Sequence, residues 1–275
     1  MKKISFEYFP PRNEGQLSRF RSTHEALCKL NPEYFSVTFG AGGSTRDETA
    51  KVVEEIGRSQ PVAPHISCRG GDENSIRQLL DRYRDKGVRK LVVLRGDPTS
   101  GSVGGDTFPF ANDLVTFIKR EYADQFSISV ACYPEVHPES RSASDDLNNF
   151  KAKVEAGADE AITQYFFNAD AYFRFVEAVT AKGISVPIVP GIMPITNYVQ
   201  LKRFSDVCGA QIPRWLDARL QDFGEDKESL NDFGLDVVAE MCHRLIDGGA
   251  PALHFYTLNR TVSTVNLVSR LGIAG

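Results

Sequence analysis

The sequence predicts an α/β protein: a single-domain (β/α)8 TIM barrel over residues 1–275, with extra helices between strands seven and eight. Eight short β-branched or aromatic runs alternate with longer amphipathic stretches along the chain. Helices interposed between strands imply parallel pairing with right-handed crossovers. The strand–Gly-x-Gly-x-x-Gly–helix unit of many open doubly wound sheets is absent, so closure into a barrel is favoured.

The expected strands are short and are bounded by turn residues. They are Ile4–Tyr8, Tyr34–Thr38, Val62–Ile66, Lys90–Leu94, Ser127–Cys132, Glu160–Gln164, Pro187–Pro190 and Ala252–Tyr256. The helices expected between them include Thr45–Ile56, Asn74–Lys86, Ala111–Tyr122, Ala143–Ala156 and Ala169–Ala181. Residues Asn197–Asp247 exceed one crossover helix, and they are expected to hold two or three helices with a loop around Asp222–Lys227.

Composition and charge exclude several classes of protein. The chain is 41% hydrophobic and 25% charged, its formal net charge is −4, and its Lys and Arg residues are dispersed. Nucleic acids and anionic membranes are therefore not expected as partners, because both require a concentrated basic surface. The chain has no signal-peptide core and no run near the roughly 18 apolar residues of a membrane span, which predicts a cytoplasmic protein.

The cysteines and histidines give no sign of a metal site. There are five of each, they are scattered, and they form neither Cys-x-x-Cys pairs nor His/Cys spacings typical of zinc. Reduced and mostly buried thiols are the expected state of the cysteines.

Polar residues end almost every expected strand, and in this barrel class the carboxyl ends of the strands form the active site. The candidates are Glu7, Thr38, His65, Arg95, Asp97, Tyr133, Glu135, His137, Gln164, Tyr256, Asn259 and Arg260. Among them, Glu7 is flanked by aromatic residues. An apolar setting disfavours a charged carboxylate and so suits a general acid, although a solvated strand-end carboxylate is the alternative.

Three other segments permit two readings each. The loop 40–45, Gly-Ala-Gly-Gly-Ser-Thr, could bring backbone N–H groups to a phosphate or flat ring, or could be a plain turn with a helix cap. The Arg95-Gly96-Asp97 segment could place ionisable groups of the site at the barrel rim, or could be a local ion pair around a glycine turn. Tyr133, in a proline-restricted loop, could stack on a flat cofactor or pack in the core.

Asp146, Asn149 and Lys153 have the spacing i, i+3 and i+7, so they share one face of their expected helix. An acceptor, an amide and a cation in one line could hold a ribose and a diphosphate. A solvated helix face is the alternative, since Leu147 and Phe150 mark the side that packs on the barrel.

Eight blocks lie between residues 5 and 260: Ser-Phe-Glu-Tyr-Phe-Pro-Pro, Ser-Val-Thr-Phe-Gly-Ala, Ala-Pro-His-Ile-Ser-Cys, Leu-Arg-Gly-Asp-Pro, Ala-Cys-Tyr-Pro-Glu-Val-His-Pro-Glu, Ala-Ile-Thr-Gln-Tyr-Phe-Phe, Pro-Gly-Ile-Met-Pro and His-Phe-Tyr-Thr-Leu-Asn-Arg. In the same order, these blocks resemble those of methylenetetrahydrofolate reductases. The chain resembles the short bacterial form, without the regulatory domain of the eukaryotic enzymes.

The resemblance implies an oxidoreductase with noncovalently bound FAD that works by a ping-pong hydride relay. NADH or NADPH would reduce the flavin and leave, and 5,10-methylenetetrahydrofolate would then become 5-methyltetrahydrofolate. By the same resemblance, Glu7 is the general acid that assists opening of the folate ring, and Asp97 stabilises the cationic iminium with its negative charge. The family also tends to form homo-oligomers.

The resemblance carries over residue by residue to two sets of positions. FAD-binding positions are Thr38, His65, Arg95, Gly96, Asp97, Ala131, Tyr133, His137, Asp146, Asn149 and Lys153. Substrate-binding positions are Glu7, Asp97, Gln164, Gln200, Phe204 and Arg260. One departure is Ala152, which stands where the family often has arginine before the lysine, and this predicts that a phosphate contact is lost or replaced.

Two other functions fit parts of the pattern. A barrel lyase or aldolase could use Glu7 and His65 on a phosphorylated substrate, but no Schiff-base lysine ends an expected strand. A non-catalytic folate- or nucleotide-binding protein would need Gln164 and Phe204 but not Glu7.

Overall fold

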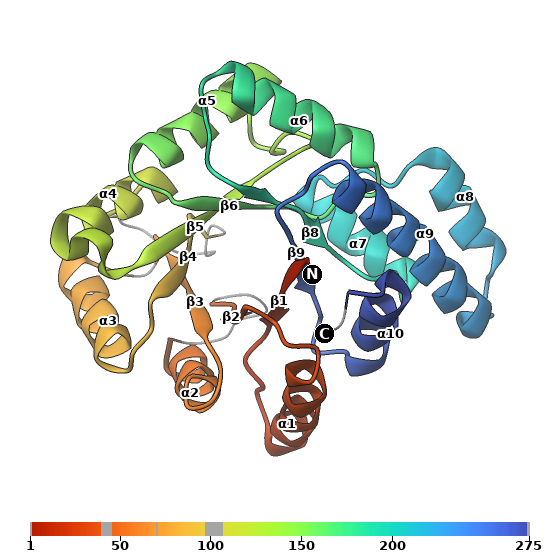
Figure 1. Ribbon diagram of the computed structural model, residues 1–275, viewed down its shortest axis with the longest axis horizontal. Coiled ribbons are helices and arrows are strands. Elements are labelled where there is room, and N and C mark those ends of the chain that lie inside the picture. Colours follow the sequence, from red (N-terminus) through yellow and green to blue (C-terminus); the bar gives the residue numbers. More distant parts are fainter. Residues whose placement is uncertain (1, 40–45, 70, 97–106, 274–275) are drawn as a thin grey trace.

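The computed structural model describes residues 2–39, 46–69, 71–96 and 107–273, and there nine parallel strands form a nearly closed barrel surrounded by helices (Figure 1). The strands are β1 Lys3–Tyr8, β2 Tyr34–Val37, β3 Val62–Ser67, β4 Lys90–Leu94, β5 Ser127–Cys132, β6 Glu160–Thr163, β7 Ile188–Val189, β8 Gly191–Ile192 and β9 Ala252–Tyr256. The predicted α/β barrel is confirmed.

The barrel closes at the seventh predicted strand, which the structure divides into β7 and β8. The sheet order is β7-β6-β5-β4-β3-β2-β1-β9-β8, so the two edge strands are joined through the single residue Pro190. β7 pairs with β6, whereas β8 pairs with β9. Pro190 has no N–H to donate, but its carbonyl accepts a hydrogen bond from the His254 N–H at 3.0 Å. The prediction of one strand over Pro187–Pro190 was therefore wrong in its bounds and continuity.

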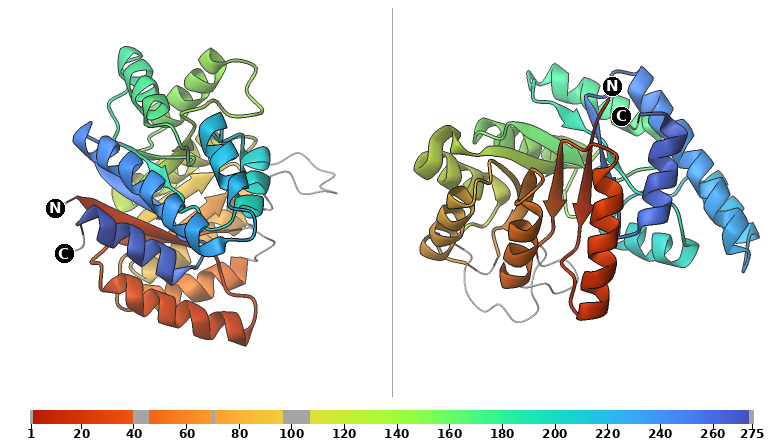
Figure 2. Two further views of the ribbon diagram at one scale, coloured as in Figure 1. Left: turned by 90° about the vertical axis from the view of Figure 1, so that its right-hand side faces the viewer. Right: turned by 60° about the horizontal axis from the view of Figure 1, so that its bottom comes forward.

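Helices cover the outer face of the barrel. They are α1 Glu14–Cys28, α2 Arg46–Ile56, α3 Glu73–Asp85, α4 Ala111–Tyr122, α5 Ala143–Glu155, α6 Ala169–Ala181, α7 Tyr198–Cys208, α8 Arg214–Asp222, α9 Lys227–Asp247 and α10 Thr261–Leu271, with a 3-10 turn at Ala123–Gln125. Side chains such as those of Asn13, Asp72 and Ser142 accept N–H groups in the first turns. The left view of Figure 2 shows α9 beside α10, with α1 next to α10.

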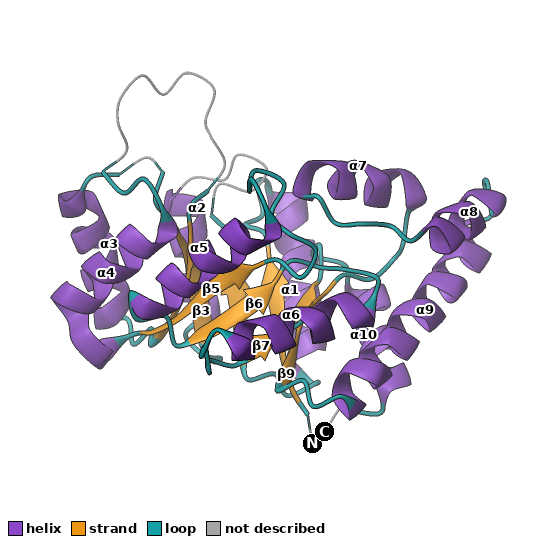
Figure 3. Cartoon of the chain, turned by 90° about the horizontal axis from the view of Figure 1, so that it is seen from above, coloured by secondary structure: helices purple, strands orange, loops and turns teal. Residues whose placement is uncertain are grey.

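The expected extra helices are α7, α8 and α9, which lie between β8 and β9 and are separated by a turn at 223–226 after α8. Both chain termini lie on one side of the barrel in Figure 3, and α7 lies on the opposite side. Because β1 starts near the amino terminus and all strands are parallel, α7 lies at the carboxyl ends of the strands. This is the side on which barrels of this class place their sites.

Successive side chains in each strand point to opposite faces, and the two faces differ in character. Outward-facing Phe6 and Tyr8 belong to the large apolar core beneath the helices. The interior has a small apolar cluster that includes Tyr34 and Val92. Lys90 and Glu160 form a 2.9 Å ion pair at the amino-terminal ends of their strands.

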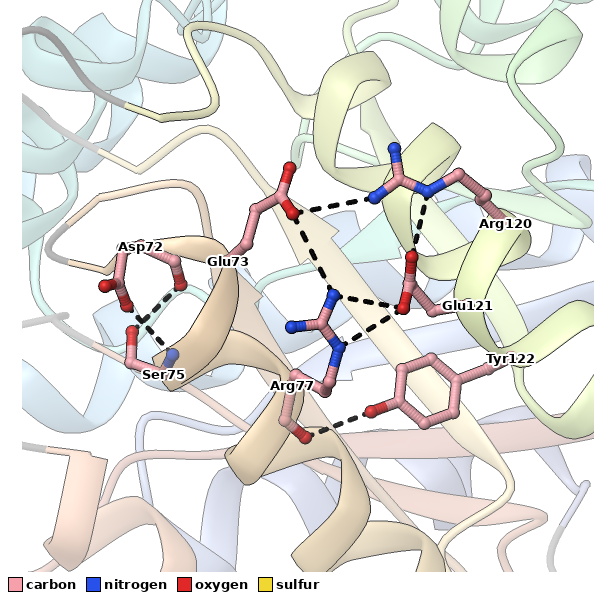
Figure 4. Close-up of polar contacts among 7 residues, drawn as sticks. All are labelled: Asp72, Glu73, Ser75, Arg77, Arg120, Glu121 and Tyr122. Atoms are coloured by element: carbon pink, nitrogen blue, oxygen red, sulfur yellow. Dashed lines mark hydrogen bonds and ion pairs between the residues drawn. The ribbon is translucent and has the colours of Figure 1, made fainter.

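A surface network joins α3 to α4. Arg77 lies between Glu73 and Glu121, with N···O distances of 3.9 and 3.0 Å, and Arg120 contacts the same two carboxylates (Figure 4). The Tyr122 hydroxyl donates to the Arg77 carbonyl at 3.0 Å. Exposed ion pairs stabilise a fold only slightly, so this network chiefly fixes how the two helices lie together.

The cysteines are free thiols, as predicted, and three of them are buried: Cys68, Cys132 and Cys242. Within the described part of the chain, none of the helices combines the length and the apolar character that a membrane crossing requires.

Candidate active site at the carboxyl ends of the strands

Glu7 lies near the carboxyl end of β1, and two histidines from other strands approach its carboxylate. Its Oε2 is 3.4 Å from Nε2 of His65 on β3 and 3.8 Å from Nε2 of His254 on β9. The Glu7 side chain is only 13% exposed. The strand-end rule thus brought Glu7 and His65 together correctly, whereas His254 was not among the predicted site residues.

His65 is a neutral imidazole in a dry environment. Burial lowers its pKa to about 4, although the nearby Glu7 carboxylate partly opposes this shift. Its Nε2 is buried and has no hydrogen-bond partner among the described residues, because the 3.4 Å contact with Glu7 lacks hydrogen-bond geometry. His65 at neutral pH therefore has an unused polar atom beside the carboxylate.

His254 lies below Glu7 in the barrel interior and is fully buried. Its Nδ1 is 2.7 Å from the Ser5 hydroxyl, and its Nε2 is 3.5 Å from the Ser36 hydroxyl. These contacts fix the ring between β1 and β2. Side chains alternate between the two faces of β9, so His254 lies on the same face as the strand-end Tyr256. This alternation was the feature of the sequence that could have indicated His254 as a site residue.

The ends of β2 and β4 supply the next group of predicted residues. Thr38 is 5% exposed, and its Oγ1 has no hydrogen-bond partner among the described residues. Gly96 has φ +80°, and a Cβ there would lie 2.2 Å from the Ser67 Oγ, so only glycine fits this position. Arg95 forms a bidentate pair with Glu139, at 2.7 and 2.8 Å. Asp97 and the loop 40–45 lie outside the described residues.

The loop after β5 folds back onto the start of α5. The Asp146 carboxylate accepts the His137 N–H and the Ser140 hydroxyl, both at 3.1 Å. The His137 ring contacts the Tyr133 ring nearly at right angles, with centroids 4.5 Å apart. Burial lowers the pKa of His137, against the opposing charges of Asp146 and Glu139. The loop is therefore held in a defined shape by the helix face predicted to bind a ligand.

Lys153 lies on the same face of α5 and reaches the strand end. Its Nζ donates to the Ala131 carbonyl at 2.6 Å, and burial lowers its pKa. Asn149, one turn before Lys153, is exposed. Of the three residues expected to share this face, Asp146 contacts the loop after β5 and Lys153 contacts β5 itself.

The remaining predicted residues come from β6, α7 and the segment after β9. Gln164 follows β6, and its Oε1 accepts the Tyr165 N–H at 3.0 Å. Gln200 and Phe204 lie one turn apart on α7. Arg260 precedes α10 and donates from Nη2 to the Gln200 Oε1 at 2.7 Å. The chain thus brings Gln200 and Arg260 into direct contact.

Several other strand-end candidates have structural partners. The Tyr256 hydroxyl donates to the Thr163 carbonyl at 2.7 Å, across the line where the barrel closes. The Asn259 side chain bonds both backbone groups of Phe9. The Glu135 carboxylate accepts the Gln211 N–H at 2.8 Å, and burial raises its pKa.

The arrangement can transfer a proton at the carboxyl ends of the strands. Glu7 is a partly buried carboxylate beside a neutral imidazole. Thr38, which directly follows β2, and His65 on the neighbouring β3 leave buried polar atoms without partners among the described residues. Buried polar atoms usually have hydrogen-bond partners, so these two atoms can accept or donate to a molecule bound at the strand ends.

Known proteins are similar to this chain over nearly its whole length. The protein-family model described as methylenetetrahydrofolate reductase matches residues 1–272. The 5,10-methylenetetrahydrofolate reductase of Escherichia coli (strain K12) is 39% identical over 272 residues, which cover 98% of this chain and 90% of that protein. A protein of Oryza sativa subsp. japonica described as probable methylenetetrahydrofolate reductase (NADH) is 35% identical over 287 residues, 98% of this chain and 48% of that protein.

A solved structure shares the fold. It is described as an uncharacterized protein from Clostridium thermocellum that binds two copies of 5-methyl-5,6,7,8-tetrahydrofolic acid. The TM-score is 0.69 at 15% sequence identity, and the match covers 98% of this chain and 94% of that one. At this identity the likeness concerns the architecture alone.

Proposed function

Since the chain belongs to the methylenetetrahydrofolate reductase family, we propose that it reduces 5,10-methylenetetrahydrofolate to 5-methyltetrahydrofolate with NADH or NADPH as electron donor. The observation that carries the proposal is the Glu7 carboxylate, held at the strand ends beside His65 and above His254. The relative named with NADH makes NADH the first donor to test. The order is ping-pong, so the nicotinamide product leaves before the folate binds.

Noncovalent FAD is the proposed cofactor, and the residues present fit it. The Thr38 Oγ1 and the His65 Nε2, both buried and without a hydrogen-bond partner among the described residues, support this assignment. FAD, when bound, supplies the two-electron carrier that links nicotinamide oxidation to folate reduction. The residues proposed to hold it are Thr38, His65, Arg95, Gly96, Ala131, Tyr133, His137, Asp146, Asn149 and Lys153, together with Asp97 outside the described residues.

Glu7 is the proposed general acid. Its carboxyl group gives a proton to the folate nitrogen that departs as the five-membered ring opens, and the C–N bond that breaks leaves its electron pair on that nitrogen. The methylene carbon becomes an electrophilic iminium that accepts hydride. Burial lowers the pKa of His65, 3.4 Å away, to about 4, so at neutral pH its imidazole is uncharged beside Glu7. Asp97 is proposed to stabilise the cationic iminium with its charge.

Substrate contacts are proposed for Gln164, Gln200, Phe204 and Arg260. Gln164 lies at the end of β6, while the other three lie on α7 and at the start of α10. Phe204 offers an aromatic face for stacking on a flat ring. The hydrogen bond between the Arg260 guanidinium and the Gln200 side-chain oxygen holds these two polar groups next to each other.

The test of this function separates the two half-reactions. We expect the purified protein to be yellow, and stopped-flow mixing should show flavin reduction by NADH or NADPH followed by reoxidation with methylenetetrahydrofolate. Glu7→Gln should keep its flavin and its reduction by nicotinamide, but reoxidation by the folate should slow about 10²- to 10⁴-fold. A Glu7→Gln protein that reduces the folate at the normal rate would disprove the acid assignment.

We also propose that residues 1–275 form one catalytic domain and that the protein is a homo-oligomer, as the resemblance implies. Light scattering of the purified protein measures the second point directly. A monomeric mass at micromolar concentration would contradict it.

A further inference from the structure

Helix α7 is tied at its carboxyl-terminal end to the residue that follows Gln164. The Tyr165 hydroxyl lies 3.1 Å from the Ser205 Oγ, and the Cys208 Sγ–H donates to the same phenol oxygen at 3.3 Å. Tyr165 is 6% exposed and Ser205 5%. Burial raises the pKa of Tyr165, so the phenol keeps its proton and can donate to Ser205.

Two further contacts hold the same end of α7 against the loop after β5. Gly209, which follows α7, packs so closely on Pro138 that an added Cβ would lie 3.1 Å from the Pro138 Cδ. The Gln211 N–H donates to the Glu135 carboxylate at 2.8 Å. The carboxyl-terminal end of α7 is thus fixed to two neighbouring loops.

The amino-terminal half of α7 is held by other contacts: the Tyr198 hydroxyl donates to the Asp217 carboxylate on α8 at 2.8 Å, and Leu201 is buried in the core. There Arg260, an exposed residue, donates to Gln200 and to the Thr196 hydroxyl. Long exposed side chains hold such contacts weakly, because they lose rotamer freedom and compete with water. At the Phe204 end, the fixed point of the helix is the buried group around the Tyr165 hydroxyl.

The proposed substrate residues of α7 lie next to that fixed point. Phe204 directly precedes Ser205, and Gln200 lies one turn earlier on the same face as Phe204. An α-helix of eleven residues moves as one body, so a shift at Ser205 moves both residues. Binding groups must lie within about 0.5 Å of their productive positions to act.

We propose that the Tyr165 hydroxyl is a positioning group, which sets the Gln200–Phe204 face of α7 relative to Gln164 and so determines the affinity for the folate substrate. This inference rests on the proposed function, which assigns those three residues to substrate binding. Tyr165 acts through Ser205 and Cys208 and does not itself touch the substrate. No covalent step is involved.

Two variants remove the connection from either side, Tyr165→Phe and Ser205→Ala. Each should raise the KM for methylenetetrahydrofolate about 3- to 10-fold, while kcat and flavin content stay within twofold of the parent. The double variant should be no worse than the more affected single one, because both changes remove the same hydrogen bond. The matched control is Tyr172→Phe, which removes a buried hydroxyl that donates to the Ile188 carbonyl at 2.8 Å, away from α7, and its KM should be unchanged.

Amide hydrogen exchange of α7 in substrate-free protein provides a readout that does not depend on the reaction. Exchange at residues 198–208 should be about tenfold faster in Tyr165→Phe and Ser205→Ala than in the parent or in Tyr172→Phe. If the parent fails to reduce methylenetetrahydrofolate, the proposed function is wrong and the exchange result alone decides whether Tyr165 holds α7. Unchanged exchange overturns the inference, as does an unchanged KM in an active protein whose α7 has been loosened.

Discussion

Acidification should destabilise this protein in part through His65. The side chain is 7% exposed, and burial lowers its pKa from an ordinary 6.5 to about 4. Between these two values the unfolded chain binds a proton that the folded chain does not, so the free energy of unfolding falls as the pH falls through this window. From pH 7.5 to pH 5.0 the linkage relation gives a loss of about 2 kcal/mol for this residue alone.

The measurement is urea unfolding at pH 7.5 and 5.0, with the same FAD concentration in every sample. His24 and His137 also have lowered pKa values because of burial, so the total loss in the wild-type protein exceeds that of one histidine. His65→Gln retains those two residues. Its free energy of unfolding should therefore fall by about 2 kcal/mol less than that of the wild type.

His243→Gln is the matched control, because His243 is exposed on α9. It should lose as much stability on acidification as the wild type. The reasoning is refuted if His65→Gln also loses the full wild-type amount, since His65 would then be protonated in the folded protein through its 3.4 Å contact with Glu7.

Two further predictions concern barrel closure and the thiols. Gly191→Ala should lower the free energy of unfolding, measured with urea, by about 1–3 kcal/mol. The new Cβ would lie 2.2 Å from the Thr163 carbonyl oxygen and 2.5 Å from the Tyr256 ring. Unchanged stability would contradict the tight packing at this position. A thiol reagent such as DTNB should label at most Cys28 and Cys208 in the native protein, and all five cysteines in urea. Cys68, Cys132 and Cys242 are buried, and burial raises the pKa of each thiol, to about 12 for Cys68. Rapid native labelling of more than two thiols would exclude this.

The strands were the easiest elements to predict. Lys90–Leu94, Ser127–Cys132 and Ala252–Tyr256 were predicted with the bounds that the structure has. Each run contains mostly residues that pack well on a pleated surface, and each is bounded by turn or polar residues. By contrast, nothing in the sequence around Pro190 indicated that the residues before it would pair with β6 and the residues after it with β9.

The site residues were predicted on different grounds, and one was not predicted. Glu7, Thr38 and His65 follow from the rule that barrel strands end in functional groups. Gln200 and Phe204 came only from the resemblance, because an amphipathic helix gives no sign of what its polar face binds. His254 was missed, since a lone histidine within a buried strand has the same sequence pattern as a histidine that merely packs in a core.

The sequence by itself determined the alternation of strands and helices and the polar residues at the strand ends. These are local properties, because hydrophobic period and turn chemistry act over a few residues. Only the tertiary structure decided that His254 contacts Glu7, that Arg260 bonds Gln200 and that the Tyr165 hydroxyl contacts Ser205. Such contacts join positions far apart in the chain, and they exist because the closed barrel brings the ends of all its strands to one rim.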